Sequence, residues 1–266
     1  MATPTSSSPL RWAAILLGFS LGGFYDGILL HQILQWHHLL SNVGAVNDMR
    51  TQVLFDGIFH ALMYVVAAVA LAKLWKARAA ANGPGAGRQL WGYALLGFGL
   101  WHIVDSVVSH WITGIHRIKI DSPNPLAWDL LWVIAFGIVP VLIAWRMLRK
   151  GASGGGGSSG SNGRRAAATL GVAALVAGSI AAVPAASDPS QIVVLFAPGV
   201  PGHQAFNALA SVDARVLWVD RSGGMWAVRM DDPKLANKLY QHGALLVSNT
   251  GFSLGCLTWT KAAVRG

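Results

Sequence analysis

Long apolar runs separated by short polar segments fill the first two thirds of the chain. Each run is near or above the ~20 residues that a helix needs to cross the hydrocarbon core of a bilayer. From residue 191 onward the period changes, and short alternating strands and helices replace the long runs. The pattern predicts five membrane-spanning helices, at about residues 12–40, 51–75, 90–118, 127–148 and 166–185.

The same pattern divides the chain into four parts. Residues 1–150 are predicted to form a four-helix transmembrane bundle, and the Gly/Ser-rich residues 151–165 a flexible cytoplasmic linker. Residues 166–187 form an anchor helix without a polar motif. Residues 188–266 follow a βαββαβ order, which is that of a small ferredoxin-like module. The expected fold class is therefore a mainly α membrane protein with an appended α+β module.

Composition supports a membrane protein, because 53% of the residues are apolar and only 12% are charged. The net charge of +9 comes from basic residues that flank the apolar runs. Membrane topology explains that placement better than a nucleic-acid partner does, so no nucleic acid is expected. The positive-inside rule places the N-terminus in the cytoplasm and the C-terminal module on the outer, periplasmic side.

Ionisable side chains stand inside these apolar runs, where a bilayer makes them costly and where they are usually functional. The first run, residues 24–40, reads FYDGILLHQILQWHHLL, and its Asp-x4-His-x5-His spacing recurs in the third run. The second run carries an Asp-x3-His pair. The residues concerned are Asp26, His31 and His37, then Asp56 and His60, then Asp105, His110 and His116.

Three of the histidines are expected at one depth. At a rise of ~1.5 Å per residue, each lies roughly 12–15 Å below the outer end of its helix. At 100° per residue, Asp26 also shares a helix face with His37. Polar faces inside lipid turn toward the bundle interior, which predicts one site in the outer half of the bundle. Its expected ligands are His31, His60 and His110, with Asp26, Asp56, Asp105 and Asp129 assisting and His37, His38 and His116 at its mouth.

Imidazole with carboxylate favours a transition metal, with copper first and iron next. The single cysteine, Cys256, excludes a cysteine-only site. Two alternatives stay open: a haem b held by two facing histidines, and His–Asp pairs that satisfy one another or relay protons. His102 lies deeper and is expected to be a satisfied core histidine. A metal site leaves the function open between a metal-handling protein and a metal-dependent membrane oxidase or monooxygenase.

The segments FYDGILLHQILQWHHLL, DGIFHAL and HWITGIH resemble an uncharacterised bacterial family of four-span membrane proteins over about residues 12–148. Members of that family often occur alongside cytochrome c oxidase assembly proteins, so the resemblance implies copper, aerobic respiration and the bacterial inner membrane. It also implies membrane partner subunits of a respiratory or copper-handling complex. The family carries paired histidines in its third span, where this chain has His110-Trp111 and His116-Arg117.

Overall fold

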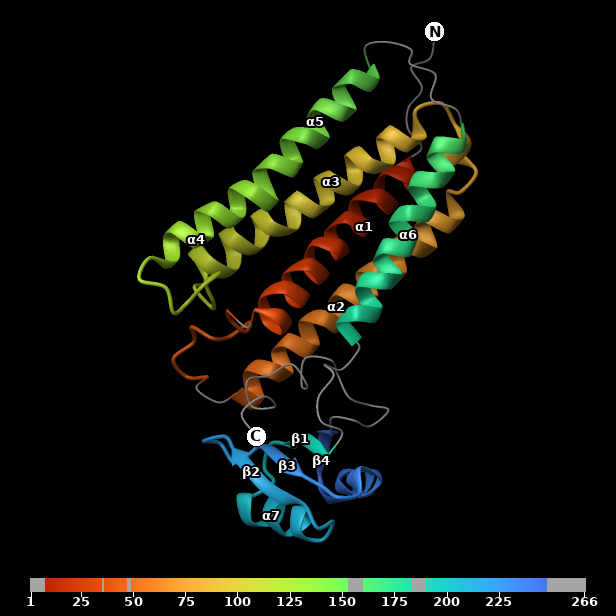
Figure 1. Ribbon diagram of the computed structural model, residues 1–266. Helices are drawn as coiled ribbons and strands as arrows, with labels where there is room; N and C mark the ends of the chain where they lie inside the picture. Colours follow the sequence, from red (N-terminus) through yellow and green to blue (C-terminus); the bar gives the residue numbers. More distant parts are fainter. Residues whose placement is uncertain (1–7, 35, 47–48, 153–159, 183–189, 248–266) are drawn as a thin grey trace. The chain divides into compact units, whose positions relative to one another are not determined.

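Long helices and one small sheet make up the described part of the chain (Figure 1). The structure is a computed structural model, and it describes residues 8–34, 36–46, 49–152, 160–182 and 190–247. The chain divides into two compact units, one of Met1–Gly27 and Phe59–Ile180 and the other of Ile28–Ile58 and Ala181–Gly266. Cys256 lies outside the described residues.

Five of the described helical segments are long and apolar enough to cross a membrane, which confirms the number predicted from the sequence. They are Ser8–Ile33, Thr51–Lys76, Ala86–Ile112, Pro125–Arg149 and Asn162–Ala182. Their elements are α1 (Ser8–Asp26) with the π-helix η1 (Gly27–Ile33), α2 (Met49–Lys76), α3 (Ala86–Asp105) with the π-helix η3 (Ser106–Ile112), α4 (Pro125–Trp132) with the π-helix η4 (Val133–Ile138) and α5 (Val139–Ala152), and α6 (Gly160–Ala182). A short 3-10 turn, η2 (Ala80–Asn82), lies between α2 and α3.

Large apolar side chains are exposed along these helices, as expected of surfaces that face lipid. Leu62 and Val65 of α2, Leu142 of α5 and Leu175 of α6 are each at least half exposed. A soluble protein rarely leaves so many apolar side chains in water along the same helices. The helices have the outward faces of a membrane protein.

A core of small and aliphatic side chains packs α1, α2, α3 and α6 together. The fifth span takes part in this core through Ala166, Leu170 and Ala174, which recur every four residues along one helix face. Tyr64 of α2 also donates a 2.7 Å hydrogen bond to the carbonyl of Gly178. The helix predicted as an anchor therefore packs against α1, α2 and α3. It begins at Gly160, so the last residues of the predicted linker are helical.

Two glycines allow α1 and α3 to approach closely along their length (Figure 1). A Cβ on Gly18 would overlap the backbone carbonyl of Ala94, and a Cβ on Gly97 would overlap that of Ile15. Small residues of this kind bring helix backbones together in membranes, where packing rather than the hydrophobic effect drives association. At these two positions, glycine is therefore a requirement of helix packing.

The first and third helices end earlier than the sequence predicts. Each ends in a π-helical segment, and the chain then folds back through a wide turn. Leu34 donates its backbone hydrogen bond to the carbonyl of Leu29, and Thr113 donates to Val108, so each bond spans five residues. The prediction that His37 continues the helical phase of Asp26 is therefore wrong, because the helical repeat stops at Ile33. His37, His38 and His116 all lie in the turns beyond the helices.

Residues 191–247 form a four-stranded antiparallel sheet in the order β2-β3-β1-β4. The strands and helices are β1 (Gln191–Phe196), α7 (Gly202–Ala210), β2 (Arg215–Val219), β3 (Met225–Arg229), the 3-10 helix η5 (Pro233–His242) and β4 (Ala244–Val247). Alternate residues of β1, namely Ile192, Val194 and Phe196, pack against Leu209 of α7 and Leu239 of η5. The segment thus has a core of its own.

Candidate metal centre

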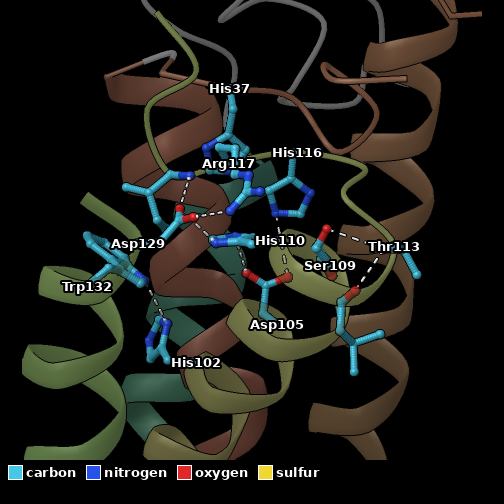
Figure 2. A network of polar contacts seen from close by, with 12 residues as sticks. His37, His102, Asp105, Ser109, His110, Thr113, His116, Arg117, Asp129 and Trp132 are labelled. Atoms are coloured by element: carbon cyan, nitrogen blue, oxygen red, sulfur yellow. Dashed lines mark hydrogen bonds and ion pairs between the residues drawn. The ribbon is translucent and has the colours of Figure 1, made fainter. Parts of the chain in front are cut away.

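His110 lies between two buried carboxylates, one on its own helix and one on the next (Figure 2). Its Nε2 is 3.1 Å from Oδ2 of Asp105, and its Nδ1 is 3.0 Å from Oδ1 of Asp129. The His110 side chain is fully buried. Both ring nitrogens therefore face negative charge in a setting that excludes water.

The turn after η3 brings a second imidazole to the same carboxylate. Nε2 of His116 is 3.6 Å from Oδ1 of Asp105, and the rings of His110 and His116 meet edge to face with centroids 4.7 Å apart. One ligand atom from each of these three residues lies within 4.8 Å of the others. We call Asp105, His110 and His116 the Asp105 group. They form a compact set of two imidazoles and one carboxylate.

Asp129 fixes the orientation of His110. Besides facing His110, this carboxylate accepts a 2.7 Å hydrogen bond from Nη1 of Arg117 and a 3.0 Å bond from the backbone N–H of Ile118. A carboxylate at one imidazole nitrogen leaves the other nitrogen for a metal ion, and such partners orient most histidine ligands in proteins. Asp129 thus directs Nε2 of His110 toward Asp105.

His102 lies one helical turn before Asp105 and next to Trp132 (Figure 2), among aromatic side chains. Nε1 of Trp132 donates a 3.1 Å hydrogen bond to Nδ1 of His102, whose ring also packs edge to face on Tyr25 and Phe98. The sequence predicts a core histidine at this position. The packing fits that role.

A second group, of three imidazoles and one carboxylate, lies in the other unit. Nε2 of His31 is 3.1 Å from Nε2 of His37, and Nδ1 of His31 is 3.2 Å from Oδ1 of Asp56. Asp56 also contacts Nδ1 of His38 at 2.6 Å and accepts a 2.8 Å hydrogen bond from the backbone N–H of Leu39. We call His31, His37, His38 and Asp56 the Asp56 group. All four residues are buried.

The separation of the two imidazole nitrogens in the Asp56 group fits a shared metal ion. Two nitrogens bound at ~2.0–2.1 Å to a tetrahedral ion lie roughly 3.3 Å apart. The His31 and His37 nitrogens are 3.1 Å apart. This group can therefore accept an ion with little movement of its rings.

The sequence-predicted ligands are thus found in two sets of contacts, with His110 in one and His31 in the other. Asp26 and His60 are both buried. Nε2 of His60 lies so close to Gly27 that a Cβ at that glycine would overlap it. The grouping of His31, His60 and His110 into one site stays a prediction.

Sequence reasoning missed three groups that position the candidate ligands. They are the guanidinium of Arg117 and the backbone N–H groups of Leu39 and Ile118. Backbone donors leave no mark in a sequence. Arg117 could have been identified from the sequence, because it follows His116 as His38 follows His37.

Comparison with known proteins gives a family but no activity. A family model described as "predicted membrane protein (DUF2243)" matches residues 13–151, slightly more than half of the chain, so the chain belongs to this family. No curated protein and no solved structure matches the chain.

Proposed function

We propose that this family member is a membrane protein that binds a transition-metal ion at its buried histidine–carboxylate groups. Copper is the first candidate and iron the second. The observation that carries the proposal is the orientation of His110: Asp129 occupies its Nδ1, and its Nε2 points to Asp105 beside His116. A carboxylate, an oriented imidazole and a second imidazole together make a conventional ligand set for such an ion.

The donor atoms favour a borderline metal over a hard or a soft one. Nitrogen from imidazole suits zinc, copper, iron and nickel, whereas magnesium and calcium prefer oxygen alone. Neither candidate group contains a thiolate or thioether, the donors that select monovalent copper. Among divalent ions bound by such a site, Cu²⁺ has the highest intrinsic affinity. Copper is therefore the ion to test first.

A proton relay is the second candidate, and one observation favours it. His110 has a carboxylate within 3.1 Å of each ring nitrogen, so a doubly protonated imidazole would also be stabilised there. Haem b is less favourable at this histidine, because an axial ligand needs one nitrogen facing an open apolar space. A bound metal ion would support the metal site over the proton relay.

The finer parts of the predicted architecture belong to the same proposal. Two helical hairpins would form the bundle. The strand order β2-β3-β1-β4 supports a ferredoxin-like module, which would lie on the periplasmic side by the positive-inside rule. Three protein ligands in the Asp105 group would leave a coordination position open, as catalytic metal sites do. A metal-dependent oxidase and a metal-handling protein of aerobic respiration therefore both fit. Respiratory or copper-handling partner subunits remain a prediction of the family resemblance.

Electron paramagnetic resonance of the detergent-purified protein loaded with Cu²⁺ tests the proposal. We expect nitrogen superhyperfine splitting from two imidazoles per ion, and the same spectrum from His203→Ala, whose histidine is exposed in α7. The His31→Ala/His110→Ala double variant should lose this splitting. A wild-type spectrum with oxygen ligands alone would contradict the proposal.

A further inference from the structure

The first and third spans share more than the spacing of their aspartates and histidines. Residues 16–21 read LLGFSL and residues 95–100 read LLGFGL. The offset is 79 positions, which is also the offset that brings His31 onto His110. Other pairs with this offset are Trp12 and Trp91, Asp26 and Asp105, Ile33 and Ile112, and His37 and His116. The chain therefore contains an internal repeat.

The backbone has the same conformation at the end of both copies. In the first copy Leu34 and Trp36 donate backbone hydrogen bonds to the carbonyls of Leu29 and Leu30, at 2.8 and 2.9 Å. The four residues 79 positions later make the same two bonds, both at 2.9 Å: Thr113 to Val108, and Ile115 to Ser109. Of the four pairs of residues in these bonds, only Leu29 and Val108 are both aliphatic. The shared turn is therefore a property of the repeat.

The contacts of the orienting carboxylate also correspond one to one. Asp56 faces Nδ1 of His31 and accepts a hydrogen bond from the backbone N–H of Leu39. Asp129 faces Nδ1 of His110 and accepts from Ile118, the residue 79 positions after Leu39. Beside each group, one oxygen of a carboxylate from the following helix thus has two equivalent partners, a histidine Nδ1 and a backbone N–H.

The contact between α1 and α3 also follows the repeat. Gly18 lies against the backbone of Ala94, and Gly97 lies against the backbone of Ile15. The offset of 79 exchanges Gly18 with Gly97 and Ile15 with Ala94. Exchanging the two copies therefore leaves the contact unchanged, as in the self-complementary interface of a two-fold dimer. Two spans of the repeat pack as equivalents.

One charged position breaks the equivalence. The remaining oxygen of Asp56 contacts Nδ1 of His38 at 2.6 Å, whereas that of Asp129 contacts the guanidinium of Arg117 at 2.7 Å. We infer that the chain holds two metal sites derived from one repeat, and that the Asp56 group binds its ion more tightly than the Asp105 group. This inference rests on the proposed function.

The physical reason is the permanent charge of arginine. A guanidinium stays protonated in proteins, so Arg117 neutralises part of the charge on Asp129 and repels a cation nearby. His38 donates its Nδ1 hydrogen to Asp56 without needing a charge. A carboxylate with less available charge makes its histidine a weaker donor to the metal. Changes in such outer partners alter metal affinity by about 10–100-fold, which is the difference expected between the two sites.

Competition titration with Cu²⁺ and a chromophoric chelator tests the inference on the full chain in detergent. The wild type should bind two ions in steps whose dissociation constants differ by about 10–100-fold. Arg117→His should tighten the weak step, and His38→Arg should weaken the tight one, so that the steps merge in each variant. Arg117→Lys keeps the charge and serves as the matched control, with two separate steps as in the wild type.

The outcomes separate this inference from the proposed function. Two equal steps in the wild type, one ion per chain, or an Arg117→His titration identical to wild type would overturn the inference and leave metal binding intact. No specific Cu²⁺ binding by any variant would overturn the proposed function itself. Two unequal steps that merge in both substitutions support the inference.

Discussion

Replacing His110 with alanine is expected to lower the affinity of the Asp105 group for Cu²⁺ by more than about 100-fold. Loss of an outer partner alone costs 10–100-fold, and His110 is a candidate direct ligand. The substitution also leaves Asp105 and Asp129 facing an empty space where the imidazole lay between them. Two buried carboxylates without the imidazole between them would destabilise the helix end as well. The measurement is the affinity of each binding step, with unfolding followed in parallel.

Two controls make the His110→Ala result specific. His203→Ala removes an exposed histidine of α7 and should leave both binding steps unchanged. The tight step, which we assign to the Asp56 group, should survive in His110→Ala and show that the protein is folded. A His110→Ala protein that binds both ions with wild-type affinity would refute the assignment of His110 as a ligand.

Replacing Asp129 with asparagine should destabilise the protein even without metal. The carboxylate is fully buried and serves His110, Arg117 and the Ile118 backbone together. Removing one partner of a buried ion pair costs roughly 3–5 kcal/mol, because the other charge is left uncompensated. We expect the lower end of that range, since the Arg117 side chain is 31% exposed and partly hydrated. Denaturant or thermal unfolding in detergent measures the change.

An exposed ion pair supplies the matched comparison for Asp129. Asp231→Asn removes the carboxylate of the Arg215–Asp231 pair, whose side chains are 74% and 84% exposed. Its effect should stay within about 0.5 kcal/mol. The Arg117→Leu/Asp129→Asn double variant should recover part of the loss, because no unpaired cation remains. If Asp129→Asn costs no more than Asp231→Asn, the carboxylate does not orient the site.

The sequence predicted the helices well because their signal is local. Apolar runs of membrane-spanning length need no knowledge of packing, and all five are helical in the structure. The ends of the first and third helices were predicted too late, because apolar residues such as Leu34, Trp36 and Ile115 still follow Ile33 and Ile112 while the backbone bonding changes. Hydropathy carries no information on such a change. The small sheet was predictable from its strand alternation and its turns.

The candidate site was predictable in its residues but not in its contacts. Buried aspartates and histidines in apolar runs stand out, and the repeated spacing already paired Asp26 with Asp105. Their assignment to partners needed the turns that bring His37 and His116 back toward the helices, and these depend on backbone bonds. The repeat LLGFSL and LLGFGL was visible in the sequence and would have indicated two sites.

Elemental analysis of the protein purified from its own membranes, without added metal, decides between a metal site and a proton relay. We expect copper, or iron as the second candidate, in at least one equivalent per chain, with a lower content in His110→Ala. A wild-type protein without stoichiometric transition metal, which also fails to take up Cu²⁺ specifically on titration, would refute the metal site and favour the proton relay.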